Sequence, residues 1–444
     1  MRTDSHDAAR TAADTLVAEL ADVLDGRRPR VSLNPGDADS DWARSGAMYL
    51  TGRADGPPRL APGAPASWAR AAVGLLGAAA RDIDGAALLG ERAALSAGLH
   101  RNSPSSVGGA FRAIPGQDGW LGLSLARPDD RTALPALIEG PVTGDPWAAL
   151  ASWLAGKPVR TARERATMLG IPAAVIGNKP SGLSRPAVLA TRGGSVAIRR
   201  KQPVVADLSS LWAGPLCAQL LSTCGARVIK VESIGRPDGA RLGSPGFYAL
   251  LHGGHESVAL DFGSAAGRRA LHALMSWADV IIEASRPRAL RNLDIDAAEF
   301  VERGAVWVSI TGYGRAAGER AGFGDDVAAG AGLVVDDAGR PVPVGDAIAD
   351  PLTGVTAAAA AMWAITSSSG WLLDVSMHDV CAQAASVAAR EREPCELACR
   401  QGRWWMETRD RPVPVLEPRA RRMRSPAPSL GMHTQGVLTE VGRE

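Results

Sequence analysis

The residue best placed for chemistry is Asp350, which stands in the run Ala349-Asp350-Pro351 directly before an alanine-rich apolar stretch. An aspartate followed by proline is typical of a helix N-cap, because the side chain accepts a backbone N–H and proline has none to lose. A helix amino terminus also favours an ionised carboxylate, the form that acts as a nucleophile. The residues alone favour the interpretation of Asp350 as a helix cap and leave open whether it is also a nucleophile.

The element expected to bring a ligand to such a group is the segment from Val204 to Arg241. An apolar β-branched run is followed by a glycine-proline pair that opens a short helix, and a second apolar run follows at once. Two strands joined by a helix should be parallel. The loops after them, 209–214 and 232–241, then lie at the carboxyl edge of the sheet, where ligands bind in open α/β sheets.

Motifs and composition exclude several classes of protein. A dinucleotide site would need G-x-G-x-x-G in the first loop, which has only Gly214, so pattern alone indicates no more than a strand–helix–strand unit. The net charge of +2 gives no general affinity for nucleic acid, and the apolar fraction of 46% is that of a globular protein. The five cysteines form no C-x-x-C pair, and we recognise neither a secretory signal nor a membrane span. We therefore expect a cytoplasmic protein without a metal.

The same segment resembles the opening of class III coenzyme A transferases, the CaiB–BaiF family. That opening consists of a strand, an L-A-G-P turn, a helix and then G-A-x-V-I-K-V-E. The resemblance is specific because many short matches keep their order and spacing along the chain. The matching runs are Trp212 to Pro215, Gly225 to Glu232, Ser257 to Asp261, Ala278 to Glu283, Ser309 to Gly314, Ala349-Asp350 and Leu372 to Ser376.

The resemblance implies an α/β fold with a Rossmann-like parallel-sheet domain, a smaller α+β domain and an interlocked homodimer. It places Asp350 at the family's nucleophilic aspartate. The implied reaction is attack of this carboxylate on an acyl-CoA, which gives a mixed anhydride and CoA thiolate. The thiolate then gives an aspartyl-CoA thioester and a free acid, and a second acid reverses the sequence. Coenzyme A is thus implied as a substrate.

The resemblance also implies which residues contact coenzyme A, most of them in loops that follow the strands. A glycine loop that covers the aspartate would be formed by Gly108 and Gly109. The implied contacts are Trp212, Ala213, Ser233, Leu260, Asp261, Phe262, Gly263, Ala284, Ser285, Arg286 and Asp325.

Several positions depart from the family pattern. Gly263 replaces a frequent lysine, Ala284-Ser285 replaces an N-F pair, and Gly254-His255-Glu256 replaces N-K-R. These changes remove positive charge that would face the phosphates of coenzyme A. The arginines expected to replace this charge are Arg236, Arg241, Arg286 and Arg288.

Racemases of the family pair an aspartate with a histidine, and the position of that histidine is occupied here by Asp325. An α-methylacyl-CoA racemase is therefore less favoured than a transferase. Asp325 and Asp326 remain either a base or, as the simpler interpretation, an exposed acidic turn. We assign no role to His252, His255 or His378.

Composition and motif order divide the chain into five parts. Residues 1–99 form a helical region, 100–177 a small α+β domain, 178–201 a linker, 202–390 the CoA-binding α/β domain and 391–444 a basic tail. We expect the tail to be a solvated extended arm, with contact to phosphates or to another subunit as the alternative.

The motifs of the small domain come before the α/β domain, which inverts the family order. The stretch from Ala43 to Pro58 echoes the sequence that precedes the family's aspartate, but at the place of the aspartate this copy has Ala66-Ser67-Trp68. We expect a tandem duplication in which the first copy lost its nucleotide-binding start and its nucleophile. The second copy would have kept both and lost its small domain.

Hydrophobic periodicity predicts the main elements. We expect helices at 8–25, 68–80, 145–155 and 161–169, and a small antiparallel sheet within 104–126. In the α/β domain we expect strands at 203–208, 227–232, 256–261, 279–283, 305–310 and 371–376, and helices at 215–223, 264–277, 296–303 and 351–366.

Three functions remain open at this point. The first is a CoA transferase that acts on an organic or fatty acid. The second is a non-catalytic CoA-binding or partner subunit, which the lost phosphate contacts favour. The third is the racemase. In each case we expect small-molecule substrates, a homodimer, and neither nucleic acid nor a membrane as partner.

Overall fold

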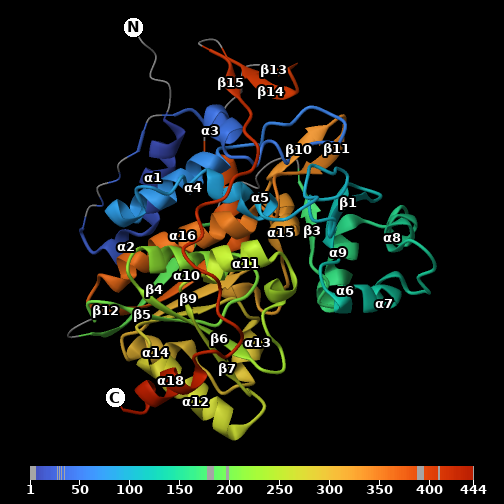
Figure 1. The fold of residues 1–444 in the computed structure, drawn as a ribbon. Helices are drawn as coiled ribbons and strands as arrows, with labels where there is room; N and C mark the ends of the chain where they lie inside the picture. The colour runs from blue at the N-terminus through green and yellow to red at the C-terminus, as the bar shows by residue number, and fades with distance from the viewer. Residues whose placement is uncertain are drawn as a thin grey trace.

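The centre of the fold is a seven-stranded sheet in the order β4-β12-β9-β8-β5-β6-β7 (Figure 1). The computed structural model describes residues 7–27, 29, 31, 33–34, 36–177, 185–196, 200–387, 395–408 and 411–443. Neighbouring strands from β12 to β7 are parallel, whereas β4 is antiparallel to β12. The strands are β4 (Val188–Ser195), β5 (Val204–Asp207), β6 (Arg227–Ser233), β7 (Glu256–Leu260), β8 (Val280–Glu283), β9 (Val306–Thr311) and β12 (Ser369–Ser376).

The parallel strands have the order of a Rossmann-like sheet. Numbered along the chain, they follow the arrangement 3-2-1-4-5-6, with the reversal between β5 and β8. Such a reversal opens a crevice at the carboxyl ends of the strands, and the loop that carries Trp212 begins there. The expected α/β fold with a parallel sheet is confirmed.

Both faces of the sheet are buried, and side chains alternate between them. Val205 packs into the larger core, whereas Val204 and Ala206 of the same strand pack into the second core on the opposite face. Trp307 packs into that second core as well, while its neighbour Val308 packs into the first. Burial on both faces explains why these strands read as continuous apolar runs.

Helices cover each face of the sheet. The larger core lies under α10 (Ala213–Thr223), α11 (Pro245–His252), α16 (Ala349–Ile365) and α17 (Met377–Ser386). The second core lies under α12 (Ala265–Trp277), α13 (Pro287–Arg291), α14 (Ala297–Glu302) and α18 (Thr434–Val441). Helix α16 approaches α10 so closely that a Cβ at Gly354 would lie 2.6 Å from the Ala213 carbonyl oxygen, so this crossing requires glycine.

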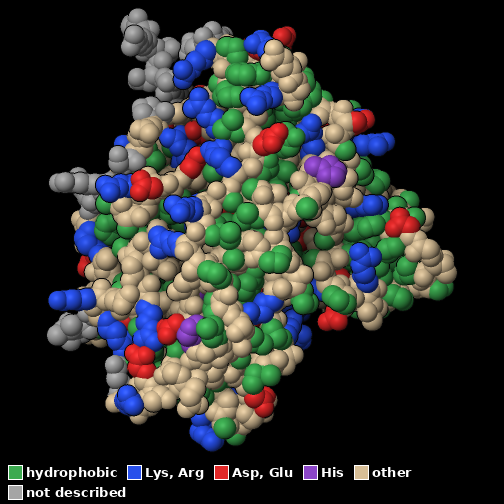
Figure 2. All heavy atoms as spheres, in the orientation of Figure 1, with side chains coloured by type: hydrophobic (Ala, Val, Ile, Leu, Met, Phe, Trp, Pro, Cys, Tyr) green, Lys and Arg blue, Asp and Glu red, His purple; other side chains and the backbone are tan. Residues whose placement is uncertain are grey.

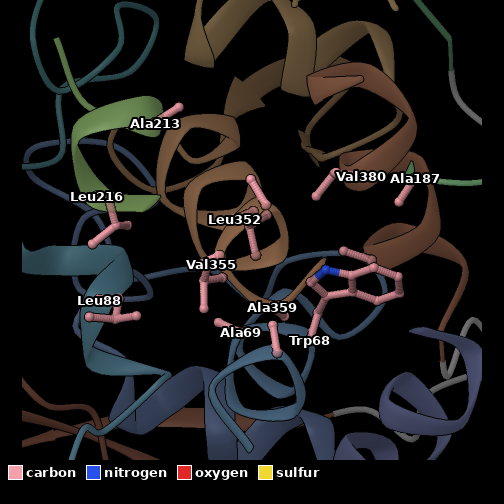
Figure 3. Close-up of a cluster of buried hydrophobic side chains, with 14 of the residues drawn as sticks. Trp68, Ala69, Leu88, Ala187, Ala213, Leu216, Leu352, Val355, Ala359 and Val380 are labelled. Atoms are coloured by element: carbon pink, nitrogen blue, oxygen red, sulfur yellow. The ribbon is translucent and has the colours of Figure 1, made fainter. Parts of the chain in front are cut away.

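The amino-terminal region adds a further layer of helices outside α16. These are α1 (Ala8–Glu19), α2 (Ala21–Leu24), α3 (Ala38–Arg44), α4 (Pro65–Leu75) and the single turn α5 (Glu91–Ala94). Figure 3 shows α4 against α16, with Ala69 and Trp68 facing Val355 and Ala359. The Trp68 indole N–H donates a 2.9 Å hydrogen bond to Thr356, which fixes the two helices in register.

The small domain forms the lobe at the right of Figure 1. Its sheet has the order β1-β2-β3, with β1 (Phe111–Pro115), β2 (Trp120–Ser124) and β3 (Ala173–Ile176) all antiparallel. Four helices complete it: α6 (Pro128–Thr132), α7 (Leu134–Ile138), α8 (Pro146–Leu154) and α9 (Val159–Met168). It has its own apolar core, which includes Leu123, Leu134 and Leu154.

Between β9 and α16 the chain forms α15 (Gly324–Gly330) and a hairpin of β10 (Val334–Asp337) and β11 (Arg340–Pro343). The pair α15 and α16 is echoed by α3 and α4, because Asp41, Gly46 and Ala66 precede Asp325, Gly330 and Asp350 by one constant separation. In the first pair Asp41 accepts a hydrogen bond from Ser67 and forms an ion pair with Arg70.

The elements predicted for the α/β domain are all present, with ends that differ by at most two residues. By contrast, the expectations for the linker and for the tail are wrong. Part of the predicted linker, 188–195, is strand β4, which pairs with β12 and extends the sheet at its edge; residues 178–184 and 197–199 lie outside the described residues. The predicted solvated tail contains β13 (Glu396–Arg400), β14 (Arg403–Glu407), β15 (Val413–Pro414) and α18.

The tail is ordered because its polar groups find buried partners. The Leu416 N–H donates to the Ala43 carbonyl, and the Arg421 guanidinium pairs with the fully buried Glu91. Further on, the residues before α18 bond to the free edge of β7, where His433 exchanges hydrogen bonds with Ser257. The segment therefore runs from the amino-terminal region to the far end of the α/β domain, as Figure 1 shows in red.

Candidate functional site

Four carboxylates gather at the amino ends of α15 and α16. Asp325 and Asp326 lie in the first turn of α15, Asp346 precedes α16, and Asp350 is the second residue of α16. Asp350 is not the N-cap expected from sequence, because α16 starts two residues earlier, with Ile348 as its cap and no side-chain capping bond. The Asp350 carboxylate instead lies against Gly324, where a side chain would overlap its Oδ2.

The electrostatic setting raises the pKa of these acids. Burial raises the pKa of Asp350 to about 7, the charge of Arg92 opposes that rise, and the nearby Asp325 and Asp346 add to it. Burial likewise raises the pKa of Asp325 to about 6 and that of Asp326 to about 7. A helix terminus favours the ionised form of Asp350, but desolvation outweighs this effect and raises the pKa.

Arg92 is the cation of this cluster, and sequence reasoning missed it. Its Nε donates a 2.8 Å hydrogen bond to Asp346 Oδ2, and its Nη2 donates to Oδ1 of the same carboxylate, which is fully buried. The guanidinium carbon lies 5.8 Å from the centre of the Trp212 ring. Arg92 follows Glu91 in a short turn without a recognisable motif, so no signal in the sequence separates it from a surface arginine.

The predicted glycine loop lies next to this cluster. A Cβ at Gly108 would lie 3.0 Å from Arg92 Nη2, and Gly109 has a φ of 74°, which favours glycine. The adjacent Ser106 forms a side-chain hydrogen bond with Asp325. The loop and the carboxylates belong to one chain.

A buried ionic network positions the loop after β5. Leu211 has a φ of 70°, and its N–H donates to Asp238 Oδ1 over 3.0 Å. The other oxygen of Asp238 lies 3.1 Å from the buried Nζ of Lys230, which also lies 3.6 Å from Asp207. This network holds Trp212 at the amino end of α10, with its ring edge-on to Phe247 at 5.1 Å.

The structure brings only some of the predicted CoA contacts to Asp350. Trp212, Ala213 and Asp325 lie around the carboxylate cluster. The others end β6 and β7 or follow β7 and β8 along the same sheet edge, and β7 is two strands, or roughly 10 Å, from β5. These more distant positions are Ser233, Leu260, Asp261, Phe262, Gly263, Ala284, Ser285 and Arg286.

Of the arginines expected to replace lost charge, two are already paired. Arg241 pairs with Glu232 at 2.6 Å and stacks on Tyr248, and Arg288 lies 3.5 Å from Glu319. Arg286 is half-buried next to Gly170 of the small domain, with no carboxylate of the described residues in ion-pair distance. The pKa of its guanidinium is lowered by burial and by Arg127 and Arg288, so an anion here would relieve repulsion.

The other departures from the family pattern place one residue in an ion pair and one in the interior of the protein. Glu256 pairs with Arg227 at 2.6 Å, and Arg227 also pairs with Glu440 of α18. His255 is buried, and burial lowers its pKa to about 3. The interpretation of Asp325 and Asp326 as an exposed acidic turn is wrong, because Asp326 is fully buried and accepts a 2.8 Å hydrogen bond from Ser124.

Within the described residues, no three side chains of the metal-ligating types come together as a metal site would require. None of the helices in that part of the chain combines the length and apolar character of a membrane span. On the face shown in Figure 2, basic and acidic side chains are interspersed.

Comparison with known proteins gives the family of the domain that bears Asp350. Residues 201–392 match the model of CoA-transferase family III. The matched part of the chain, the family III domain, is similar to CoA-transferase family III. The family III domain therefore starts just before β5 and ends after α17, and it includes Asp350 but neither Arg92 nor the glycine loop.

Relatives of this family III domain match only part of the chain. An acyl-CoA transferase of Fusarium pseudograminearum is 30% identical over 34% of this chain and 38% of its own. A succinyl-CoA–D-citramalate CoA-transferase of Chloroflexus aurantiacus is 27% identical over 39% of this chain and 48% of its own. A CaiB/BaiF family protein of Brucella suis is 26% identical, with a TM-score of 0.38 over 42% of this chain and 55% of its own. The chain thus spans about a third to a half of the length of the curated relatives it matches.

Proposed function

We propose that the chain is a CoA transferase that uses Asp350 to move coenzyme A from an acyl-CoA to a carboxylic acid. The observation that carries this proposal is the setting of Asp350 in a family III domain, beside Trp212 and Arg92, with its pKa raised to about 7. A carboxylate with such a pKa is a stronger nucleophile than an ordinary aspartate, and much of it is still ionised at neutral pH.

The reaction needs no external oxidant or metal. The Asp350 oxygen forms a bond to the thioester carbonyl carbon, the C–S bond breaks, and CoA leaves as the thiolate. The thiolate sulfur then attacks the aspartyl carbonyl of the anhydride and releases the first acid as a carboxylate. The carboxylate of the second acid attacks the aspartyl-CoA thioester, and the returning thiolate gives the new acyl-CoA and restores Asp350.

The chain offers contacts for each end of coenzyme A. We infer that the thioester lies beside Trp212 and Ala213, and that the nucleotide end follows the sheet edge towards the loop 260–263 and the segment 284–286. Arg286 would meet a phosphate, because it has no carboxylate partner among the described residues. Gly108 and Gly109 would exclude water from the anhydride.

Donor and acceptor follow from the relatives only as a class. The relatives from Chloroflexus aurantiacus and Homo sapiens are named for succinyl-CoA. Succinyl-CoA is therefore the first donor to test, with small organic acids as acceptors.

The proposal extends to the evolutionary origin, the oligomeric state and the location of the chain. We infer that the chain arose by the expected duplication, in which α3 and α4 retain the form of α15 and α16 without the nucleophile. The homodimer expected from the family remains our proposal for the assembly, although the Asp350 cluster is complete within one chain. Cys217, Cys224, Cys381 and Cys399 are free thiols, which supports a cytoplasmic location.

A second candidate function is a non-catalytic CoA-binding subunit. It is favoured by Gly263 and by Glu256, whose carboxylate is committed to Arg227 where the family has a basic residue. The racemase is a third candidate, because the buried Asp325 and Asp326 have the raised pKa of a general base.

Transfer assays with isotope-labelled CoA distinguish these functions. The full-length chain is incubated with succinyl-CoA and a panel of carboxylic acids, and new acyl-CoA thioesters are identified by mass spectrometry. A transferase produces them and loses this activity in Asp350→Asn. Saturable binding of CoA without any product would leave the binding subunit, and exchange of an α-hydrogen with solvent deuterium would reveal the racemase.

A further inference from the structure

Arg92 is held on two sides and open on a third. Asp346 accepts hydrogen bonds from its Nε and Nη2, and Trp212 covers one face of the guanidinium. Two of the five N–H donors of an arginine are thus used, which leaves three, including both on Nη1. About a third of the Arg92 side chain is exposed, at 30%, and no described residue accepts a hydrogen bond from Nη1.

The open edge lies where the reaction would place its developing charge. Gly108 approaches the Nη2 side without a Cβ, and the charge of Arg92 acts on Asp350, Asp325 and Asp346 together. We propose that Arg92 is a catalytic residue of the transferase, which donates to the thioester oxygen during attack and keeps Asp350 ionised beforehand. This role rests on the function proposed above.

Arg92 acts on the step that forms the anhydride. As the Asp350 oxygen bonds to the thioester carbon, the negative charge moves from the carboxylate to the former carbonyl oxygen. Donors on a guanidinium that is already fixed stabilise this oxyanion without reorganisation. When the C–S bond breaks, the charge passes to the sulfur and the donors return to a neutral carbonyl. No proton has to move.

A purely structural role is the alternative, because a buried Asp346 needs a counter-ion. The ion pair with Asp346 alone would fulfil a structural role. That role would require neither an exposed guanidinium nor N–H donors without an acceptor. Trp212 and Asp346 belong to the family III domain, whereas Arg92 comes from the segment before it. The cation is thus brought into the domain from outside, and it is kept accessible there.

The test measures anhydride formation by single-turnover release of CoA thiolate from succinyl-CoA, as a function of pH. The single variants are Arg92→Met, Arg92→Lys and Arg92→Ala. The double variant Arg92→Met/Asp346→Asn also removes the unpaired acid and so guards against misfolding. Arg59→Met is the matched control, because Arg59 also pairs with an aspartate, Asp337, but contacts none of the four acids.

We expect Arg92→Met and the double variant to lose roughly 10²–10³-fold in rate, the usual effect of removing one oxyanion donor. The pH at which activity appears should rise above the wild-type value, Arg92→Lys should recover part of the rate, and methylguanidinium should restore activity to a folded Arg92→Ala. A folded double variant with wild-type rate and pH profile would overturn the role of Arg92. If the wild type itself releases no thiolate, the proposed function fails, and the role of Arg92 fails with it.

Discussion

Ser124 of the small domain donates a 2.8 Å hydrogen bond to Asp326 of α15, although the two residues are 202 positions apart in the chain. The same domain brings Ser106 to Asp325 and Gly108 to Arg92. These contacts place the small domain over the carboxylate cluster of its own chain. The proposed catalytic centre is therefore composite, with contributions from the small domain and from the α/β domain of the same chain.

Completion of the site within one chain predicts a negative result in complementation. Co-expressed Asp350→Asn and Arg92→Met chains, carrying different tags and purified through both, should show no more activity than either variant alone. In an interlocked arrangement with sites shared between chains, one site of each mixed dimer would contain neither defect. Recovery of about half of wild-type activity, as one intact site in each mixed dimer predicts, would contradict the account.

The raised pKa of Asp350 predicts how the substitution Asp350→Asn affects stability. Between the ordinary value near 4 and the folded value of about 7, the folded protein binds more protons than the unfolded chain, so stability falls as pH rises through this window. Asp350→Asn cannot lose stability in this way, so its melting temperature at pH 8 should be above that of the wild type. The difference should be roughly 2–4 °C for each kcal/mol of unfolding free energy that is recovered. At pH 4 the two melting temperatures should coincide. Asp55→Asn, on the surface, serves as control, and an equal shift at both pH values would argue against the assignment.

The ion pair of Arg421 with Glu91 predicts that the tail stabilises the site from a distance. Arg421→Met leaves the fully buried Glu91 carboxylate without a partner, which costs about 3–5 kcal/mol in comparable buried pairs. Urea unfolding should show this loss, and Glu91→Gln in the same chain should recover much of it. Arg422→Met removes the neighbouring exposed charge and should have little effect. Equal free energies of unfolding for the two arginine variants would refute this role of the tail.

The close approach of the glycine loop predicts that Gly108→Ala harms catalysis more than folding. Its Cβ would lie 3.0 Å from Arg92 Nη2, so the guanidinium would have to shift from its position between Asp346 and Trp212. We expect about a tenfold lower rate of thiolate release, with a melting temperature near that of the wild type. Gly140→Ala, in the same domain and with open space around it, is the control. Equal rates for the two variants would show that the loop does not restrain Arg92.

The α/β domain was predictable from the sequence because its signals are local. Strands such as 227–232 are continuous apolar runs, and the positions after them fall at one sheet edge by topology alone. The position of Trp212 beside the site followed from the same rule. The helix that carries Asp350 was also predicted, but its start was placed too late, because the aspartate-proline pair resembles a cap while the helix begins at Ala349.

The remaining features depend on contacts between distant segments. Arg92 and Glu91 stand in a single helical turn whose sequence carries no periodic pattern, and their partners Asp346 and Arg421 are far away in the chain. Strand β4 lies in a segment rich in proline, glycine and arginine, which resembles a linker in sequence. It forms a strand because it pairs with β12 at the edge of the sheet. Tertiary partners decide these cases, and composition does not reveal them.

The central claim is that the Asp350 carboxylate becomes covalently acylated. The protein is mixed with succinyl-CoA, quenched with hydroxylamine and digested, and the peptide that contains Asp350 is analysed by mass spectrometry. The account predicts a hydroxamate on Asp350 that depends on the thioester and on an intact Arg92. An unmodified Asp350 under conditions in which the thioester is consumed, or a modification on another residue, would contradict it.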